Sequence, residues 1–275
     1  MSINKKDSLG DRMKGYENKT RIYLEPKTPV IIRLDGRAFH TITQGFDKPF
    51  DAVMTACMEQ TLKKLCESVS GVLLGYTQSD EITLLLGDWA NSDTQMFFNG
   101  NILKIASITA SAATLAFNKA LISEIEKLKA AGEDASCYEK AYNTNAMFDS
   151  RCFNVPFSEV VNSLLWRQQD AIRNSKQAVA QANYSARALH GLNCDELVEK
   201  LKDELGIVWS DFPIYQQRGT LCERVEVTEE ITYTIKRTQE QKKAIVTRNK
   251  WVLNHEMPLF SEMRESIEAM FPKGN

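Results

Sequence analysis

The chain has 275 residues, of which 43% are hydrophobic and 25% charged, and its formal net charge is −2. This is an ordinary globular composition, and a chain this long buries a sizeable core. The near-neutral charge argues against a general nucleic-acid coat, which would be basic, so any RNA binding has to use local patches. No apolar run approaches the roughly 20 residues of a spanning helix, and Met1–Asp7 lacks the apolar core of a signal peptide. We expect a cytoplasmic protein that does not enter a membrane.

The six cysteines and three histidines show no metal-ligand spacing. Scattered single cysteines in an intracellular chain are usually reduced residues that pack in the core. We therefore expect neither a zinc site nor disulfide bonds.

The first elements alternate between helix and strand. Asp7-Ser8 can cap a helix that runs to about Leu24. Prolines at 26 and 29 end this segment and begin a short β-branched strand, 30–34, which leads straight into Asp35 and Gly36. An amphipathic helix is expected over 49–68.

Two strands follow, with the polar turn Gln78-Ser79-Asp80-Glu81 between them. A right-handed crossover through the helix would place the first strand beside this hairpin, so that Asp35 and Asp80 meet at one edge. Two converging carboxylates suit Mg²⁺, and two such ions support phosphoryl or nucleotidyl transfer. The alternative remains open that the Asp-Gly pair is a simple turn and the hairpin tip merely solvated.

A polar link and a long helix over about 101–129 come next, with Lys104 in the first turns of the helix. We expect a surface loop over 130–144 and a strand over 145–155, which Pro156 ends. This order predicts an α+β fold, an antiparallel sheet with two helices on one face in the split βαβ arrangement.

The remainder of the chain has a different pattern of predicted elements. A long helical pattern covers 157–189, a further helix ends near 205, and alternating residues from 220 to 234 indicate a hairpin. The stretch 236–250 is strongly basic, with Glu240 as its single acid. It is either a solvated hairpin arm or a contact for RNA backbone. A short helix over 261–271 closes the chain. We expect two regions, a catalytic core with its N-terminal helix over 1–156 and a helical and β-arm region over 157–275 packed on it.

Several blocks together resemble the tRNA-His guanylyltransferase family and its bacterial and archaeal guanylyltransferase-like relatives. They follow the family order over residues 8 to 220: Asp11-Arg12-Met13-Lys14, Asp35-Gly36-Arg37-Ala38-Phe39-His40, Gln78-Ser79-Asp80-Glu81, Phe148-Asp149-Ser150-Arg151 and Trp166-Arg167-Gln168-Gln169-Asp170. The resemblance implies a polymerase-like palm with helical and β-hairpin C-terminal additions. It also implies a Mg²⁺-dependent nucleotidyltransferase that activates the 5′ end of tRNA with ATP and then adds GTP or another nucleotide in the 3′-5′ direction. Such enzymes are commonly homotetramers.

Carried over by position, the resemblance assigns roles to individual residues. Asp35, Asp80 and Glu81 would be catalytic, and Asp35, Asp80 and the Gly36 carbonyl would hold Mg²⁺. The nucleotide would bind to Asp35, Gly36, Arg37, Ala38, Phe39, His40, Ser79 and Asp80. Phosphates would meet Lys48, Lys104 and Arg151. We expect tRNA contacts from Arg167, Arg173, Lys236, Arg237, Lys242 and Lys243.

One block departs from the family pattern. Where eukaryotic members carry a His-Ile-Asn-Asn motif, this chain has Ile172-Arg173-Asn174-Ser175. Bacterial-type relatives also lack the motif. The departure favours template-directed repair of the tRNA 5′ end over addition of one non-templated guanosine. Two other readings stay open: a palm-type nucleotide cyclase or cyclic-dinucleotide synthase, and an RNA-binding module in which the acids are structural.

Overall fold

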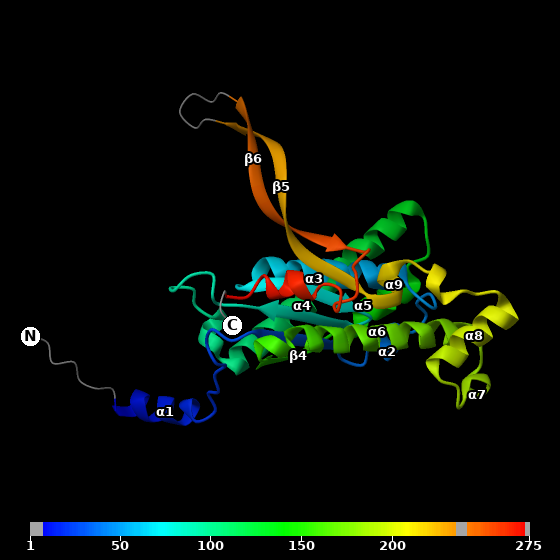
Figure 1. Cartoon of the computed structure of the whole chain (residues 1–275), viewed down its shortest axis with the longest axis horizontal. Helices are drawn as coiled ribbons and strands as arrows, with labels where there is room; N and C mark the ends of the chain where they lie inside the picture. The colour runs from blue at the N-terminus through cyan, green and yellow to red at the C-terminus, as the bar shows by residue number, and fades with distance from the viewer. Residues whose placement is uncertain (1–7, 235–240, 273–275) are drawn as a thin grey trace, which may run out of the picture.

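A single antiparallel sheet organises the chain (Figure 1). The computed structural model describes residues 8–234 and 241–272. Within them the sheet has six strands in the order β4-β1-β3-β2-β5-β6. The strands are β1 (Val30–Gly36), β2 (Val72–Gln78), β3 (Glu81–Leu86), β4 (Phe148–Asn154), β5 (Thr220–Thr234) and β6 (Gln241–Asn254). The α+β prediction is confirmed.

The centre of the sheet has the split βαβ arrangement. Helix α3 (Ala52–Ser68) connects β1 to β2, and β3 lies between these two strands and pairs with both. The register places Asp35 opposite Glu81 on one side and opposite Asp149 on the other. The end of β1 therefore meets the β2–β3 turn, as the crossover argument predicts.

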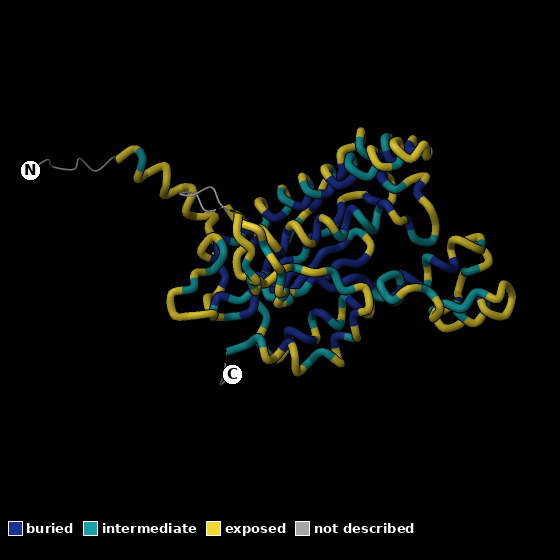
Figure 2. The backbone as a smooth tube through the Cα atoms, turned by 90° about the horizontal axis from the view of Figure 1, so that it is seen from above, coloured by how far each residue is buried: buried dark blue, intermediate teal, exposed yellow. Residues whose placement is uncertain are grey.

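Helices cover both faces of the sheet. Alternate strand residues point to opposite faces, so Ile32 and Leu34 pack with α3 and α4 while Ile31 packs with α6 and the C-terminal segment. Figure 2 shows the buried residues between these layers and the exposed ones around them. Only the first of the two faces was expected to carry helices. The first strand of the 157–275 region, β5, also pairs with β2 and so belongs to the same sheet.

Several helix boundaries differ from the sequence-based expectation. The first helix ends at Asn18 rather than near Leu24, and the expected loop at 130–144 contains helix α5. The long helix expected over 157–189 is broken near 184–185 into α6 and α7. The helices are α1 (Ser8–Asn18), α2 (Phe39–Ile42), α4 (Ile102–Ala131), α5 (Ser136–Thr144), α6 (Val160–Asn183), α7 (Ala186–Leu189), α8 (Cys194–Leu205), α9 (Ile214–Arg218) and α10 (Arg264–Glu268), with short 3-10 turns at Phe97–Gly100, Phe157–Glu159 and Trp209–Asp211.

Helix α4 is the one helix of the described residues that is long and apolar enough to cross a membrane, by length and composition. Here it packs against α3 and β4 and buries Ile105, Phe117 and Leu121 in the main core. The length and composition of this helix therefore contradict the expectation that no apolar stretch approaches spanning length. Its apolar residues serve the core of this fold.

Strands β5 and β6 continue past the sheet as a long twisted ribbon that projects from the body (Figure 1). Three basic residues of β6 face glutamates of β5. Lys243 pairs with Glu230 at 3.1 Å, and Glu229 binds Lys250 and lies 3.9 Å from Arg248. These partners, distant in sequence, offset much of the positive charge that the stretch 236–250 shows when read alone.

Gly75 provides a test of how closely α3 packs on the sheet. A Cβ atom at this position would lie 2.5 Å from Cys66 Sγ and 2.7 Å from Leu62 Cδ1. We expect Gly75→Ala to lower the free energy of unfolding by about 1–3 kcal/mol through overpacking, measured by urea denaturation. Gly15→Ala is the matched control, because nothing lies within 4 Å of its Cβ position. Equal stability of the two variants would contradict the close α3–β2 contact.

Candidate active site

The two predicted metal acids meet at the edge of the sheet. Asp35 ends β1, Asp80 lies in the β2–β3 turn, and the Gly36 N–H donates to the Asp80 carbonyl at 3.0 Å. Ser79 adopts a left-handed conformation with φ of 49°, which tightens a turn that has no glycine. The structure thus brings together the residues that the sequence places 45 positions apart.

The carboxylates of Asp35 and Asp80 lack a neutralising partner. No ion pair is present for either group within residues 8–234 and 241–272. Burial raises the pKa of Asp80, and the negative charges of Asp35 and Glu81 raise it further. Two half-buried acids that repel each other are suited to a bound cation. No group of three or more Asp, Glu, His or Cys side chains forms a metal cluster in the described part of the chain, so any cation would rest on these two carboxylates and backbone oxygens.

Glu81 has a different environment from its neighbour Asp80. Its carboxylate accepts two hydrogen bonds from Arg167, from Nε and Nη2, each at 2.7 Å. The two side chains are only 9% and 11% exposed. Arg167 also donates to Asp170 at 3.0 Å and lies over the ring of Trp166. Glu81, which we expected to be catalytic, is therefore held by α6, and the guanidinium of Arg167, which we expected to contact tRNA, is already engaged.

A cavity of about 460 Å³, here called the outer cavity, is lined by Asp80 and by Gly36, the residue that follows Asp35. Gly36 lies under the Phe39 ring, and a Cβ there would come within 2.4 Å of that ring, so the close turn requires glycine. Another part of the lining is built on Asp51, which caps α3 and whose carboxylate accepts hydrogen bonds from Asp47 N and Tyr138 Oη. The lining residues are Gly36, Ala38, Phe39, His40, Thr43, Phe46, Asp47, Lys48, Pro49, Asp51, Met54, Ser79 and Asp80.

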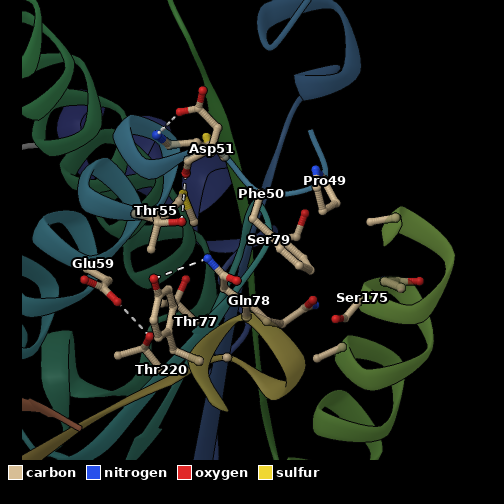
Figure 3. Close-up of a pocket in the computed structure, with 18 residues that line it drawn as sticks. Pro49, Phe50, Asp51, Thr55, Glu59, Thr77, Gln78, Ser79, Ser175 and Thr220 are labelled. Carbon is tan, nitrogen blue, oxygen red and sulfur yellow. Dashed lines mark hydrogen bonds between the residues drawn. The ribbon is translucent and has the colours of Figure 1, made fainter. Parts of the chain in front are cut away.

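A second pocket of about 200 Å³, here called the inner pocket, lies on the other side of Ser79 (Figure 3). It is walled by α3, α6, and the α9–β5 junction. Pro49, Asp51, Met54 and Ser79 line both spaces, so the two adjoin at the turn that carries Asp80.

The other expected contact residues are spread more widely. Lys48 lines the outer cavity, whereas Lys104 is exposed in the first turn of α4. Arg151 is half exposed and bound to Asp149 at 2.7 Å, and Arg173 is bound to Asp170 at 2.5 Å. Lys242 and Lys243 lie on the ribbon, away from the sheet edge. Arg37 is exposed beside the metal acids. Lys236 and Arg237, which we expected to contact tRNA, lie outside the described residues.

Sequence reasoning missed two residues that shape these spaces, Asp51 and Gln78. Asp51 directly precedes helix α3, and its carboxylate accepts a hydrogen bond from the backbone N–H of Met54. An Asp at the start of a helical pattern is an N-cap signal that could have identified it. Gln78 ends a buried strand directly before the metal turn, and nothing in its sequence context separates it from an ordinary turn residue.

Comparison with known proteins agrees with this geometry. The sequence model of the Thg1 family, described as tRNAHis guanylyltransferase, matches residues 10–156, just over half of the chain. The chain belongs to the tRNAHis guanylyltransferase family. The resemblance noted in the sequence is confirmed, and the match ends where β4 runs into Pro156.

Two solved structures share the fold of this family member along nearly all of its length. A bacterial tRNA(His) guanylyltransferase (Thg1)-like protein in complex with ATP is 37% identical, with a TM-score of 0.78 over 96% of this chain and 99% of its own. Such a protein in complex with GTP is 36% identical, with a TM-score of 0.73 over 96% of this chain and 98% of its own. An uncharacterized protein of Acanthamoeba polyphaga mimivirus is 29% identical over 79% of this chain and 77% of its own length.

Proposed function

We propose that this enzyme activates the 5′-monophosphate of a tRNA with ATP and then adds a nucleotide to it in the 3′-5′ direction. The observation that carries the proposal is the meeting of Asp35 and Asp80, without a counter-charge, at the mouth of a cavity that Lys48 and His40 line. Membership of the family and the ATP and GTP complexes of its bacterial relative support this reaction.

The donor set suits Mg²⁺. Two carboxylates and the Gly36 carbonyl offer hard oxygens, and Mg²⁺ usually keeps several water and phosphate ligands of its own. When bound there, Mg²⁺ supplies a charge that activates the attacking oxygen and neutralises the leaving one. A cation bound there would also offset the burial and the charge repulsion that raise the pKa of Asp80.

The reaction comprises two displacements at phosphorus. The 5′-phosphate oxygen of the tRNA attacks the α-phosphorus of ATP, and pyrophosphate leaves. The 3′-hydroxyl of the incoming nucleoside triphosphate then attacks the activated 5′-phosphate, and AMP leaves. In both steps Lys48 would offset phosphate charge, and the Gly36–Phe39 turn would allow the phosphates to approach the backbone closely. Arg151, on β4, would contact a phosphate of the tRNA strand.

We further propose that residues 1–156 form the catalytic palm and residues 157–275 a supporting region. The family match, which ends at residue 156, supports this division. The enzyme would work on tRNA in the cytoplasm. The Ile172–Ser175 sequence supports template-directed repair as the preferred use.

The test is incorporation on a tRNA that lacks its first nucleotide and carries a 5′-monophosphate, with Mg²⁺, ATP and each nucleoside triphosphate in turn. We expect the nucleotide complementary to the opposite strand to be added at least about tenfold faster than the other three. Equal addition of guanosine opposite adenosine would reject templated repair. If no nucleotide were added with any template, the tRNA transferase assignment itself would fail.

Helix α1 bears on the assembly of the enzyme. It has no buried residue and projects from the body in both views (Figures 1 and 2). Leu9, Met13 and Tyr16 nevertheless share one face at helical spacing and are 57%, 45% and 59% exposed. An isolated helix of 11 residues is marginal in water. We propose that this face packs on another copy of the chain within a homotetramer.

We expect Leu9→Asp combined with Met13→Asp to lower the mass of the assembly, measured by light scattering after gel filtration, because the charges would have to be buried between subunits. Lys14→Asp, on the same helix but away from the apolar face, should leave the mass unchanged. An unchanged mass in the double variant would place the contact elsewhere.

A further inference from the structure

The inner pocket is enclosed on three sides and is smaller than a site for a whole nucleotide. Small-molecule sites usually measure roughly 300–1,000 Å³, whereas this pocket measures about 200 Å³. Its walls are largely apolar: Phe50, Met54 and Met58 come from the α3 side, and Ala171 and Ala178 from α6. The size and lining suit one ring system.

Most polar groups in this pocket are already paired. Glu59 accepts hydrogen bonds from Thr220 Oγ1 at 2.7 Å and interacts with His255 Nε2 at 2.7 Å. Thr77 donates to the Glu81 carbonyl at 2.9 Å, and Ser175 accepts from Trp209 Nε1 at 3.0 Å. These groups hold the walls together and leave little capacity for a ligand.

Gln78 differs from these groups. Its side chain is only 9% exposed, and its amide has no hydrogen-bond partner among residues 8–234 and 241–272. Because strand residues alternate between faces, Gln78 shares the α6 face with Tyr76, which packs there with Leu164 and Phe260. Figure 3 shows Gln78 between Thr77 and Ser175, in the middle of the lining residues. Because Gln78 lines the pocket and its amide is unpaired, the pocket offers an occupant an amide N–H donor and a carbonyl acceptor.

We propose that the inner pocket binds an adenine base, stacked between the apolar walls and read by the Gln78 amide. A glutamine amide can pair with adenine through two hydrogen bonds, accepting from N6 and donating to N7. The inference rests on the proposed function, since the pocket adjoins the outer cavity at Ser79 and a base held there belongs to a substrate of that site. The base comes either from ATP or from an unpaired adenosine of the tRNA.

Titration calorimetry with adenosine tests the pocket without requiring catalysis. We expect adenosine to bind the full-length wild type, and Gln78→Leu to weaken this binding by about tenfold or more. Ala178→Phe fills the pocket from α6 and should weaken binding similarly. Gln177→Leu is the matched control, because Gln177 is exposed on α6 and does not line the pocket.

The edge contact has its own test. 7-Deazaadenosine lacks the N7 acceptor, so it should bind the wild type about tenfold more weakly than adenosine but bind Gln78→Leu as adenosine does. Competition by ATP, and by tRNA with or without its terminal adenosine, identifies the source of the base. Displacement of adenosine by either one supports the proposal.

Three results would overturn the proposal: no adenosine binding by the wild type, binding by the Gln78→Leu and Ala178→Phe variants as tight as that of the wild type, or displacement of adenosine by neither ATP nor tRNA. Failure of the proposed function is recognised separately, because it would appear as absent tRNA extension in a wild type whose adenosine binding is intact.

Discussion

We expect Asp80→Asn to reduce tRNA extension by at least about a thousandfold while leaving the fold intact. A metal ion stabilises transferring phosphoryl groups by several kcal/mol, and each ~1.4 kcal/mol corresponds to about a factor of ten in rate. The amide keeps the shape of the side chain but removes the charge that would hold the ion. Single-turnover extension of a 5′-truncated tRNA measures the loss.

The same substitution should not destabilise the protein. Burial and the charges of Asp35 and Glu81 raise the pKa of Asp80 in the folded state. A group whose folded pKa lies above its unfolded value opposes folding once the pH exceeds the unfolded pKa, because the charged form is then disfavoured in the fold. Removing that charge at pH 7 should therefore leave the melting temperature unchanged or raise it.

Two controls sharpen this test. Mg²⁺ should raise the melting temperature of the wild type but not of Asp80→Asn, because a ligand stabilises only a protein that binds it. Asp93→Asn, in an exposed loop, should behave as the wild type in both assays. An Asp80→Asn variant that kept its extension rate would show that the acids are structural. It would then favour the alternative of an RNA-binding module.

The sequence carries enough information to place Asp35 and Asp80 together. Short apolar strands, one amphipathic helix and the handedness of a crossover determine the topology, and the register then brings the end of β1 to the β2–β3 turn. These are local patterns joined by one general rule, which is why the core is predictable.

Long-range pairing is not predictable in this way. The charge of the stretch 236–250 looks basic along the chain, but Glu229 and Glu230 lie opposite it in the ribbon. Arg167 reads as a free cation on a helix, yet its partner Glu81 is 86 residues away. Such contacts depend on how distant elements pack together, and local patterns in a single sequence do not show this. The inner pocket likewise depends on tertiary structure, because its walls come from α3, α6 and the α9–β5 junction, which lie in separate parts of the chain.

The buried ion pair between Arg167 and Glu81 should carry the largest effect on stability. We expect Arg167→Met to lower the free energy of unfolding by about 3–5 kcal/mol, because it leaves the Glu81 carboxylate buried without a counter-charge. Methionine keeps much of the apolar stem, so most of the loss would come from the charge and not from packing. Urea denaturation at pH 7 measures it.

A second substitution separates this cause from a general packing defect. In the double variant Arg167→Met with Glu81→Gln, no unpaired charge remains at position 81, so at least half of the lost stability should return. Arg173→Met is the matched control: its side chain is 58% exposed and pairs with the same Asp170, so its loss should be at most about 1 kcal/mol. If the double variant were as unstable as Arg167→Met alone, the pair would not be what fixes the start of β3 against α6. In that case the placement of Asp80, one residue before Glu81, would depend on the turn geometry and the Gly36 hydrogen bond alone.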